Sequence, residues 1–308
     1  MAILRRGGTA LDAVEAAIHP VESNLDDHSV GKSGLPNILG VVELDASIMD
    51  GWTLAAGAVG GVHGYEHPIS IARRVMEELP HSLLVGEGAD RFAKECGFPQ
   101  VDLLTPEAQR IYSERLRGQG GGPGSPGGPS GDSILRAVSA RLTMDPEMAH
   151  PKDAGTVNVI ARDRDGHLAV GVSTSGWPWK YPGRVGDSAV IGAGNYCDDR
   201  WGAAACTGRG EMAIRCATAH TAVTLMQAGL GAQGAGLRAM QNLDHLVDPY
   251  FGAMNCVVMD PQGRHAAFST NAKATYVWMD EKSEDVRESP RTHVELKGRE
   301  VADRRLKA

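Results

Sequence analysis

Apolar positions along the chain follow helical spacing in some segments and strand-like spacing in others. The segment from Gly7 to Glu22 predicts an amphipathic helix, with Thr9 and Asp12 as a capping pair near its start. Pro68 and Pro106 stand where a first helical turn tolerates proline, and Gly97 stands where a helix ends. The further helices are expected over 67–80, 89–97, 105–118, 210–229 and 232–247.

Strand-like segments occur in pairs joined by short turns. Three hairpins are expected, over 41–59, 156–173 and 253–270. The strand that begins at Thr156 is apolar almost throughout, whereas a strand with one face in solvent alternates. Antiparallel sheets covered on both faces, with helices to spare, predict an α+β fold of stacked sheets between helical layers.

Composition narrows the class of protein. The chain has 308 residues, of which 42% are hydrophobic, and its net charge is −7 without a basic stripe, so a nucleic-acid partner is not expected. Residues 118–131 are glycine, proline and serine apart from Gln119, and they predict a flexible linker that continues as irregular chain to 155. The charged tail after Glu281 is expected to be a solvated segment.

Cysteine usage and hydropathy bear on location. The five cysteines have no C-x-x-C spacing, which favours a reducing compartment over a disulfide framework. No apolar run approaches the roughly 20 residues of a membrane span, so no membrane partner is expected. The prediction is a cytoplasmic protein, although a signal ahead of Met1 stays open.

Two other kinds of motif are not expected to form a functional site. Residues 63–67, His-Gly-Tyr-Glu-His, match an H-x-x-E-H zinc pattern, but that chemistry needs helix and the motif lies between glycines and Pro68. It is expected to be a loop that enters the next helix. The glycine-rich segments 57–64 and 192–196 lack the strand–GxGxxG–helix context of a dinucleotide site. No metal or cofactor is therefore predicted.

Candidate chemistry starts at Thr156, where a long structureless stretch stops abruptly at a strand. A lone threonine there is usually just a β-branched residue in a favourable place. In this chain, however, G-T-V at 155–157 is followed by T-S-G at 174–176, G-R-V-G-D-S-x-x-x-G-A-G at 183–194 and T-G-x-G-E at 207–211.

In this order and spacing, the motifs resemble the type 2 asparaginase family of N-terminal-nucleophile hydrolases, over nearly the whole chain. The resemblance implies that the Thr156 hydroxyl attacks the Gly155 carbonyl and that the resulting ester hydrolyses. A freed α-amine has a pKa of about 7.7–8.0, so it can serve as the base for its own hydroxyl. Cutting the chain would thus produce the base that a threonine nucleophile needs.

The resemblance also implies roles for six further residues. Thr174 would orient the nucleophile, Arg184 would bind the substrate α-carboxylate and Asp187 the α-ammonium, while the Thr207 hydroxyl and the Gly208 N–H would form the oxyanion hole. Gly210 would belong to the substrate-binding segment. The alternative for Arg184 and Asp187 is an ordinary salt bridge within a turn.

Residues 26–51 and 67–98 resemble the glycosylasparaginase branch. In that branch a serine near the nucleophile corresponds to Ser29. Trp177 and Trp179 precede Arg184, and an indole face could stack on the sugar of a glycoasparagine; the alternative is that both tryptophans simply pack a loop.

Three features depart from the family pattern. Ala154 and Gly155 precede the nucleophile where this branch has His-Asp, and Asn158 stands where the family has glycine. Both changes bear on the rate of self-cleavage. The family also begins with a strand that carries active-site residues, whereas Met1 already lies in the first helix, so that strand is expected to be missing from these residues.

Together these expectations describe one structural domain, a four-layer αββα sandwich, cut into an α chain (1–155) and a β chain (156–308). The expected reaction is hydrolysis of the side-chain amide of a glycosylated asparagine, without metal or cofactor, in a homodimer of αβ units. L-Asparaginase or isoaspartyl dipeptidase activity is the first alternative. An uncleaved, non-catalytic homologue is the second.

Overall fold

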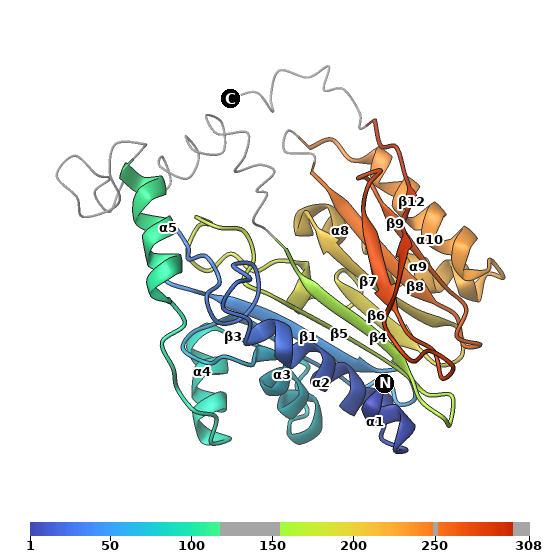
Figure 1. Ribbon diagram of the computed structural model, residues 1–308, viewed down its shortest axis with the longest axis horizontal. Coiled ribbons are helices and arrows are strands. Elements are labelled where there is room, and N and C mark those ends of the chain that lie inside the picture. The colour runs from blue at the N-terminus through green and yellow to red at the C-terminus, as the bar shows by residue number, and fades with distance from the viewer. Residues whose placement is uncertain (118–154, 249–251, 298–308) are drawn as a thin grey trace.

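A computed structural model describes residues 1–117, 155–248 and 252–297 (Figure 1). The helices are α1 (Ala2–Arg5), α2 (Ala10–Glu22), α3 (Pro68–Glu78), α4 (Gly86–Glu95), α5 (Pro106–Arg117), α8 (Gly210–Cys216), α9 (Thr218–Gln227) and α10 (Ala232–Gln241), with 3₁₀ turns η2 (Asp187–Ala189) and η3 (Asn242–His245). The strands are β1 (Leu44–Asp50), β2 (Ala56–Val62), β3 (Leu83–Val85), β4 (Val157–Arg162), β5 (Leu168–Thr174), β6 (Asn195–Asp198), β7 (Gly202–Gly208), β8 (Met254–Met259), β9 (His265–Ser269), β10 (Thr275–Trp278), β11 (Arg287–Pro290) and β12 (Thr292–His293).

The first sheet has the strand order β3-β2-β1-β5-β4. Strand β1 pairs antiparallel with both β2 and β5, so that Asp45 lies opposite Thr174. The predicted hairpin β4–β5 closes this sheet at one edge, with Val157 opposite Ser173. This register brings Thr156, the residue before β4, beside Thr174, the last residue of β5.

The second sheet has the order β12-β9-β8-β7-β6. Strands β6 to β9 are antiparallel neighbours, and Thr207 at the end of β7 lies opposite Asn255 of β8. Figure 1 shows α9 and α10 running along this sheet, while α2 and α3 lie along the first.

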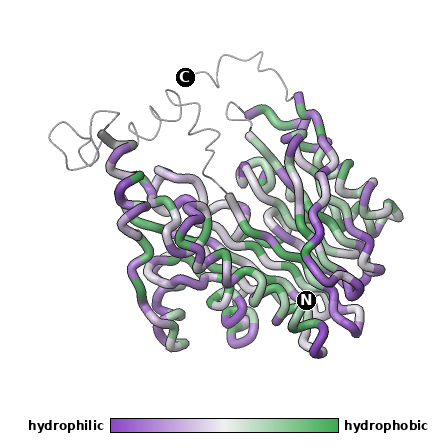
Figure 2. The backbone as a smooth tube through the Cα atoms, viewed as in Figure 1, coloured by the Kyte–Doolittle hydropathy of each residue, from purple (hydrophilic) through white to green (hydrophobic). Residues whose placement is uncertain are grey.

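Apolar clusters hold the two sheets and their helices together, and apolar residues run along the strands in Figure 2. One joins α2, α3 and α4 to the first sheet through buried residues such as Val14, Ile48 and Ile69. A second joins α8, α9 and α10 to the second sheet. A third contains Val170 of β5 and Ala203 of β7, so apolar side chains of both sheets meet. The predicted α+β class is confirmed.

The predicted capping pair is also confirmed. The Asp12 N–H donates to Thr9 Oγ1 at 3.1 Å, and the Thr9 N–H donates to Asp12 Oδ2 at 3.3 Å. These two bonds satisfy amides that a helix N-terminus leaves unpaired. All three predicted hairpins are present as β1–β2, β4–β5 and β8–β9.

The single long helix expected over 210–229 is wrong, because the chain breaks into α8 and α9 at Ala217. Ala217 has φ 45° and ψ 49°, in the left-handed region. The first amides of α9 instead bind outside the helix: Ala219 N donates to the Ala193 carbonyl at 3.3 Å and His220 N to the Gly192 carbonyl at 2.9 Å. These acceptors come from a distant loop, so helical periodicity alone gave no sign of the break.

The tail expected to be solvated after Glu281 is indeed mostly exposed over the described residues 282–297, but the strands within it were not predicted. Strand β11 pairs with β10, and β12 adds to the edge of β9. Val294 is buried, and its N–H donates to the Ser269 carbonyl at 2.8 Å. Most charged side chains of this segment are exposed, while its backbone forms hydrogen bonds with neighbouring strands. The number of charged residues in a segment therefore does not show whether its backbone forms a strand. The linker expected over 118–155 lies outside the described residues except for Gly155.

None of the helices in the described ranges is long and apolar enough to span a membrane.

Candidate active site

Thr156 and Thr174 are neighbours because the β4–β5 hairpin is antiparallel. Thr156 Oγ1 donates to Thr174 Oγ1 at 3.2 Å or to the carbonyl oxygen of Gly155 at 2.8 Å. Thr174 Oγ1 also lies 2.9 Å from the Gly155 oxygen and accepts a hydrogen bond from Gly176 N at 3.0 Å. Two hydroxyls therefore converge on one peptide carbonyl.

Ser29 lies against the same peptide. A Cβ at Gly155 would be only 2.5 Å from Ser29 Oγ, so a residue with a side chain there would collide. Asp27 Oδ1 accepts from both Oγ and N of Ser29, at 2.6 and 2.8 Å, and the Ser29 carbonyl accepts from Ser175 N at 2.8 Å. The loop before β1 is thereby fastened to the end of β5, with Ser29 beside the Gly155–Thr156 peptide.

Arg184 makes its ion pair with Glu211. Its Nε and Nη2 donate to Glu211 Oε1 at 3.0 and 2.9 Å, and the guanidinium is mostly buried. Burial acts to raise the pKa of Glu211, but the positive charges of Arg184 and Arg209 outweigh it. The pKa of Glu211 is therefore lowered. The ion pair of Arg184 is therefore with Glu211, and not with Asp187 in the same turn as the alternative had it.

Asp187 begins the turn η2 and is buried. Its Oδ2 has no hydrogen-bond partner among the residues that the structure describes. Burial raises the pKa of Asp187 to about 7, although the positive charge of Arg184 acts in the opposite direction. A buried carboxylate without a partner is costly unless a cation or donor approaches it. The arrangement suits a cationic ligand.

Gly210 leaves room for both charged side chains. A Cβ there would lie 2.5 Å from Asp187 Oδ1 and 3.2 Å from Arg184 Nη2. The start of α8 therefore sits directly against the predicted recognition pair. Asp45 fastens this region to β1, because Gly186 N donates to Asp45 Oδ2 at 3.0 Å.

Trp177 lies beside the two arginines. The guanidinium carbon of Arg209 is 4.6 Å from the centre of the Trp177 ring, and that of Arg184 is 5.8 Å away. Trp179 differs: it is 2% exposed and packs with Leu35 and Ile38. The packing interpretation therefore applies to Trp179, while Trp177 contacts the predicted substrate-binding region.

Thr207 and Gly208 lie at the end of β7. Asn255 Nδ2 donates to Thr207 Oγ1 at 3.0 Å. Gly208 has φ 115°, and a Cβ there would lie 2.1 Å from the Ala253 carbonyl, so only glycine fits. Gly208 precedes Gly210 by two residues, and Gly210 lies against Arg184 and Asp187. Thr207 and Gly208 are therefore linked through the chain to the predicted substrate-binding residues.

The sequence analysis missed Glu211 and Lys180. Glu211 was visible as the last residue of the T-G-x-G-E run, but its pairing with Arg184 was not. Lys180 is buried beneath the site, where Nζ donates to the carbonyls of Glu43 and Ser175 at 2.9 and 3.0 Å. Burial lowers its pKa. Nothing local in the sequence marks this lysine.

The H-x-x-E-H segment is a loop, as expected, and its histidines bind different carboxylates. His63 Nδ1 lies 2.9 Å from Asp90 Oδ2, and hydrogen bonds to Asp90 and Glu43 raise the pKa of His63 to about 9. His67 Nδ1 lies 3.0 Å from Glu22 Oε2 instead.

The arrangement combines a hydroxyl next to a carbonyl, a fixed guanidinium, and a buried carboxylate with one unpartnered oxygen. Such a set can attack an acyl group and hold a ligand that carries both a carboxylate and an ammonium. These are the two ends of an α-amino acid.

Comparison with known proteins agrees with this chemistry. A family model described as asparaginase matches residues 1–288. A plant-type L-asparaginase of Pyrococcus abyssi is 39% identical over 277 residues, which cover 89% of this chain and 84% of that protein. The mouse N(4)-(beta-N-acetylglucosaminyl)-L-asparaginase is 37% identical over 82% of this chain and 75% of its own length. The mouse isoaspartyl peptidase/L-asparaginase is 35% identical over 88% of this chain and 75% of its own length.

Proposed function

Because the chain belongs to the type 2 asparaginase family of N-terminal-nucleophile hydrolases, we propose that it is an amidohydrolase which activates itself by cleaving its own Gly155–Thr156 bond. One observation carries the proposal. Thr156 Oγ1 lies 2.8 Å from the Gly155 carbonyl oxygen, and the Thr174 hydroxyl reaches the same oxygen at 2.9 Å.

In self-cleavage, Thr156 Oγ1 attacks the Gly155 carbonyl carbon and the Gly155–Thr156 amide breaks. The acyl group moves from nitrogen to oxygen, and water hydrolyses the ester. A Gly155 carboxylate and a free Thr156 α-amine result. Thr174, as a donor to the carbonyl oxygen, would stabilise the negative charge that develops there.

In substrate hydrolysis, the Thr156 α-amine takes the proton of its own hydroxyl, which attacks the side-chain carbonyl of the substrate. Thr207 Oγ1 and Gly208 N–H would stabilise the oxyanion. The amine leaves with a proton, a β-aspartyl ester remains on Thr156, and water releases aspartate. This sequence uses only the chain's own groups and water.

Arg184 and Asp187 would select the aspartyl part of the substrate. The guanidinium suits the α-carboxylate, since Glu211 occupies its Nε and one N–H of Nη2 and other donors remain. Asp187, with its unpartnered Oδ2, suits the α-ammonium. Asparagine, glycosylated asparagine and β-aspartyl peptides all carry this α-carboxylate and α-ammonium.

For the leaving group we propose N-acetylglucosaminylamine, so that the substrate is a glycosylated asparagine. The likeness of 26–51 and 67–98 to glycosylasparaginases and the position of Trp177 beside Arg184 support this choice. Asparagine or a β-aspartyl dipeptide is the second candidate, supported by 39% identity to plant-type L-asparaginases.

The architecture is proposed to be the four-layer αββα sandwich, with an α chain 1–155, a β chain 156–308 and a homodimer of αβ units. The cluster between Val170 and Ala203 and the two helix-facing clusters support the layering.

Intact-mass spectrometry of the purified chain, with Thr156→Ala as control, tests the proposal. We expect two fragments divided between Gly155 and Thr156 that the variant lacks. The cleaved protein is then assayed on GlcNAc-asparagine, asparagine and β-aspartyl dipeptides, and the highest kcat/KM identifies the substrate class. A single intact mass after long incubation, without activity, would instead indicate an uncleaved homologue.

A further inference from the structure

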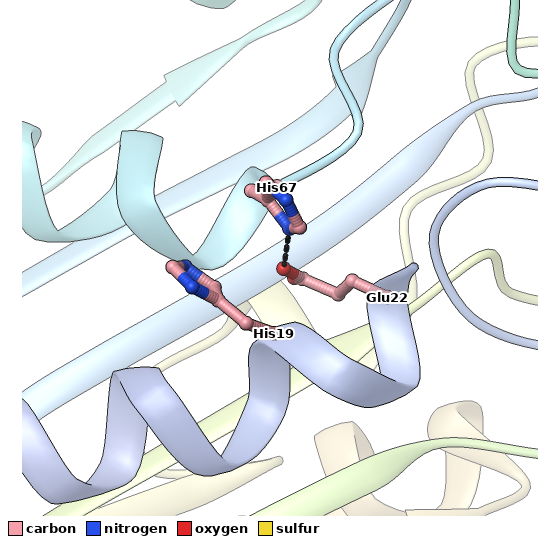
Figure 3. A group of neighbouring side chains, drawn as sticks. All are labelled: His19, Glu22 and His67. Carbon is pink, nitrogen blue, oxygen red and sulfur yellow. Dashed lines mark hydrogen bonds and ion pairs between the residues drawn. The ribbon is translucent and has the colours of Figure 1, made fainter. Parts of the chain in front are cut away.

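We propose that His19, Glu22 and His67 form a zinc-binding site, separate from the chemistry at Thr156. Among the histidine, cysteine and acidic side chains of the described ranges, these three offer one ligand atom each, all within 4.8 Å of one another (Figure 3). The site does not depend on the proposed hydrolase activity.

Two helices bring the three side chains together. His19 and Glu22 are three residues apart at the end of α2, so they project from the same side of the helix. His67 directly precedes α3. Figure 3 shows the two imidazoles and the carboxylate gathered at the junction of these helices. The ring centres of His19 and His67 are 4.4 Å apart.

The donor set is one that zinc prefers. Two imidazoles and one carboxylate, with a fourth position left for water, form a common zinc environment. Bonds of about 2.0–2.1 Å in a tetrahedron place ligand atoms about 3.3 Å apart. His67 Nδ1 and Glu22 Oε2 are already 3.0 Å apart, and all three ligand atoms lie within 4.8 Å of one another, so a tetrahedral site requires His19 to move toward the other two.

The carboxylate is held by a second layer of hydrogen bonds. Glu22 is fully buried, and its Oε1 accepts from Ile69 N at 3.1 Å and from Ser173 Oγ at 2.7 Å. Its Oε2 is thereby directed at His67. Such outer contacts orient metal ligands in proteins.

His19 is also held in place, since its Nε2 lies 2.7 Å from Ser70 Oγ.

The surrounding charge is compatible with a cation. Glu15 Oε1 lies 3.7 Å from His19 Nε2 and adds negative charge. The nearby Arg73 is already paired with Glu15, Asp12 and Glu77. The side chains of His19 and His67 are 38% and 33% exposed, so an ion can enter from solvent.

The site is connected to the neighbourhood of Thr174 by hydrogen bonds of Glu22. Ser173, which donates to Glu22, precedes Thr174 in β5, and the Glu22 carbonyl accepts from Lys32 N at 2.8 Å in the loop that carries Ser29. A bound ion would connect α2, α3 and β5 and stabilise the fold that positions Thr174. At a free concentration about 100 times its Kd, zinc would raise Tm by roughly 5 °C.

Isothermal titration calorimetry of the full, EDTA-stripped and dialysed chain with ZnCl₂ tests the proposal, with MgCl₂ as the comparison ion. We expect one Zn²⁺ per chain and no magnesium binding. His67→Asn and His19→Gln should each weaken zinc binding at least ~100-fold. His81→Ala, at an exposed histidine outside the site, should bind as the parent does. Cobalt(II) should show the absorption of tetrahedral coordination in the parent and in His81→Ala, but not in His67→Asn or His19→Gln.

Three results would overturn the site: no stoichiometric zinc binding, equal loss in His81→Ala, or unchanged binding in both His67→Asn and His19→Gln. Circular dichroism and Tm in EDTA identify a variant that fails to fold. His19→Gln then decides the question if His67→Asn is unfolded, because His19 is the more exposed ligand.

Discussion

Thr156 Oγ1 lies 3.2 Å from Thr174 Oγ1, although 18 positions separate the two threonines in the chain. The antiparallel pairing of Val157 with Ser173 accounts for this contact. Since Thr174 also reaches the Gly155 carbonyl at 2.9 Å, its hydroxyl is the group best placed to assist cleavage of the Gly155–Thr156 bond.

Replacing Thr174 with valine should therefore slow self-cleavage by roughly 100-fold, because one donor to a developing oxyanion is worth about that factor. Thr174→Ser retains the hydroxyl and should cleave at near the parent rate. A time course of intact masses gives both rates. Equal rates for the valine and serine variants would contradict the assignment.

Glu211 is expected to position Arg184 for the substrate carboxylate. Glu211→Ala frees the guanidinium to move, and we expect KM for the amino-acid substrate to rise about tenfold with little change in kcat. Steady-state kinetics on the cleaved enzyme measure both constants. Glu284→Ala, at an exposed position, serves as control. A lower KM would show instead that Glu211 competes with the substrate.

Gly210→Ala should remove most activity while the protein stays folded. Its Cβ would lie 2.5 Å from Asp187 Oδ1, so the carboxylate must move. We expect kcat/KM to fall by at least ~100-fold, as small displacements at a reacting centre cost about that much. Gly88→Ala introduces the same methyl group into open space in α4 and should leave activity unchanged. Comparable losses in both variants would be inconsistent with this role.

The raised pKa of Asp187 predicts a pH dependence of substrate binding. Burial raises this pKa to about 7, so Asp187 is largely neutral below that pH and ionised above it. An α-ammonium binds the ionised form, and KM should therefore fall as pH rises from 6 to 8. The same shift means that the folded state binds more protons than the unfolded state between about pH 4 and 7, so stability falls with rising pH in that window.

The pH effect on KM can be separated from that of the Thr156 α-amine, which acts on kcat. Asp187→Asn should abolish the fall in KM while the rise of kcat with pH remains. Persistence of the KM profile in Asp187→Asn would rule out Asp187 as its source. Chemical denaturation at pH 5 and pH 7 measures the stability difference.

The two tryptophans before Arg184 should respond differently to alanine. Trp179→Ala removes a buried indole and should lower the free energy of unfolding by about 3–5 kcal/mol. Trp177→Ala should cost little stability but reduce activity on GlcNAc-asparagine relative to asparagine. Denaturation curves and kinetics on both substrates measure these effects. An unchanged activity ratio in Trp177→Ala would argue against a sugar contact.

Local signals in the sequence predicted much of this molecule. Hydrophobic spacing and turn residues predicted the three hairpins, and the capping pair Thr9–Asp12 was correct in detail, because these depend on residues close together in the chain. The order of the motifs around Thr156 was enough to predict the family.

Tertiary structure decided what depends on residues far apart in the chain. The break at Ala217 exists because carbonyls of Gly192 and Ala193 bind the first amides of α9. Arg184 pairs with Glu211 only because the turn η2 lies against the start of α8. His19 and Glu22 meet His67 only where two helices end together. Spacing along the chain encodes local geometry, whereas packing between distant segments sets which polar groups become partners.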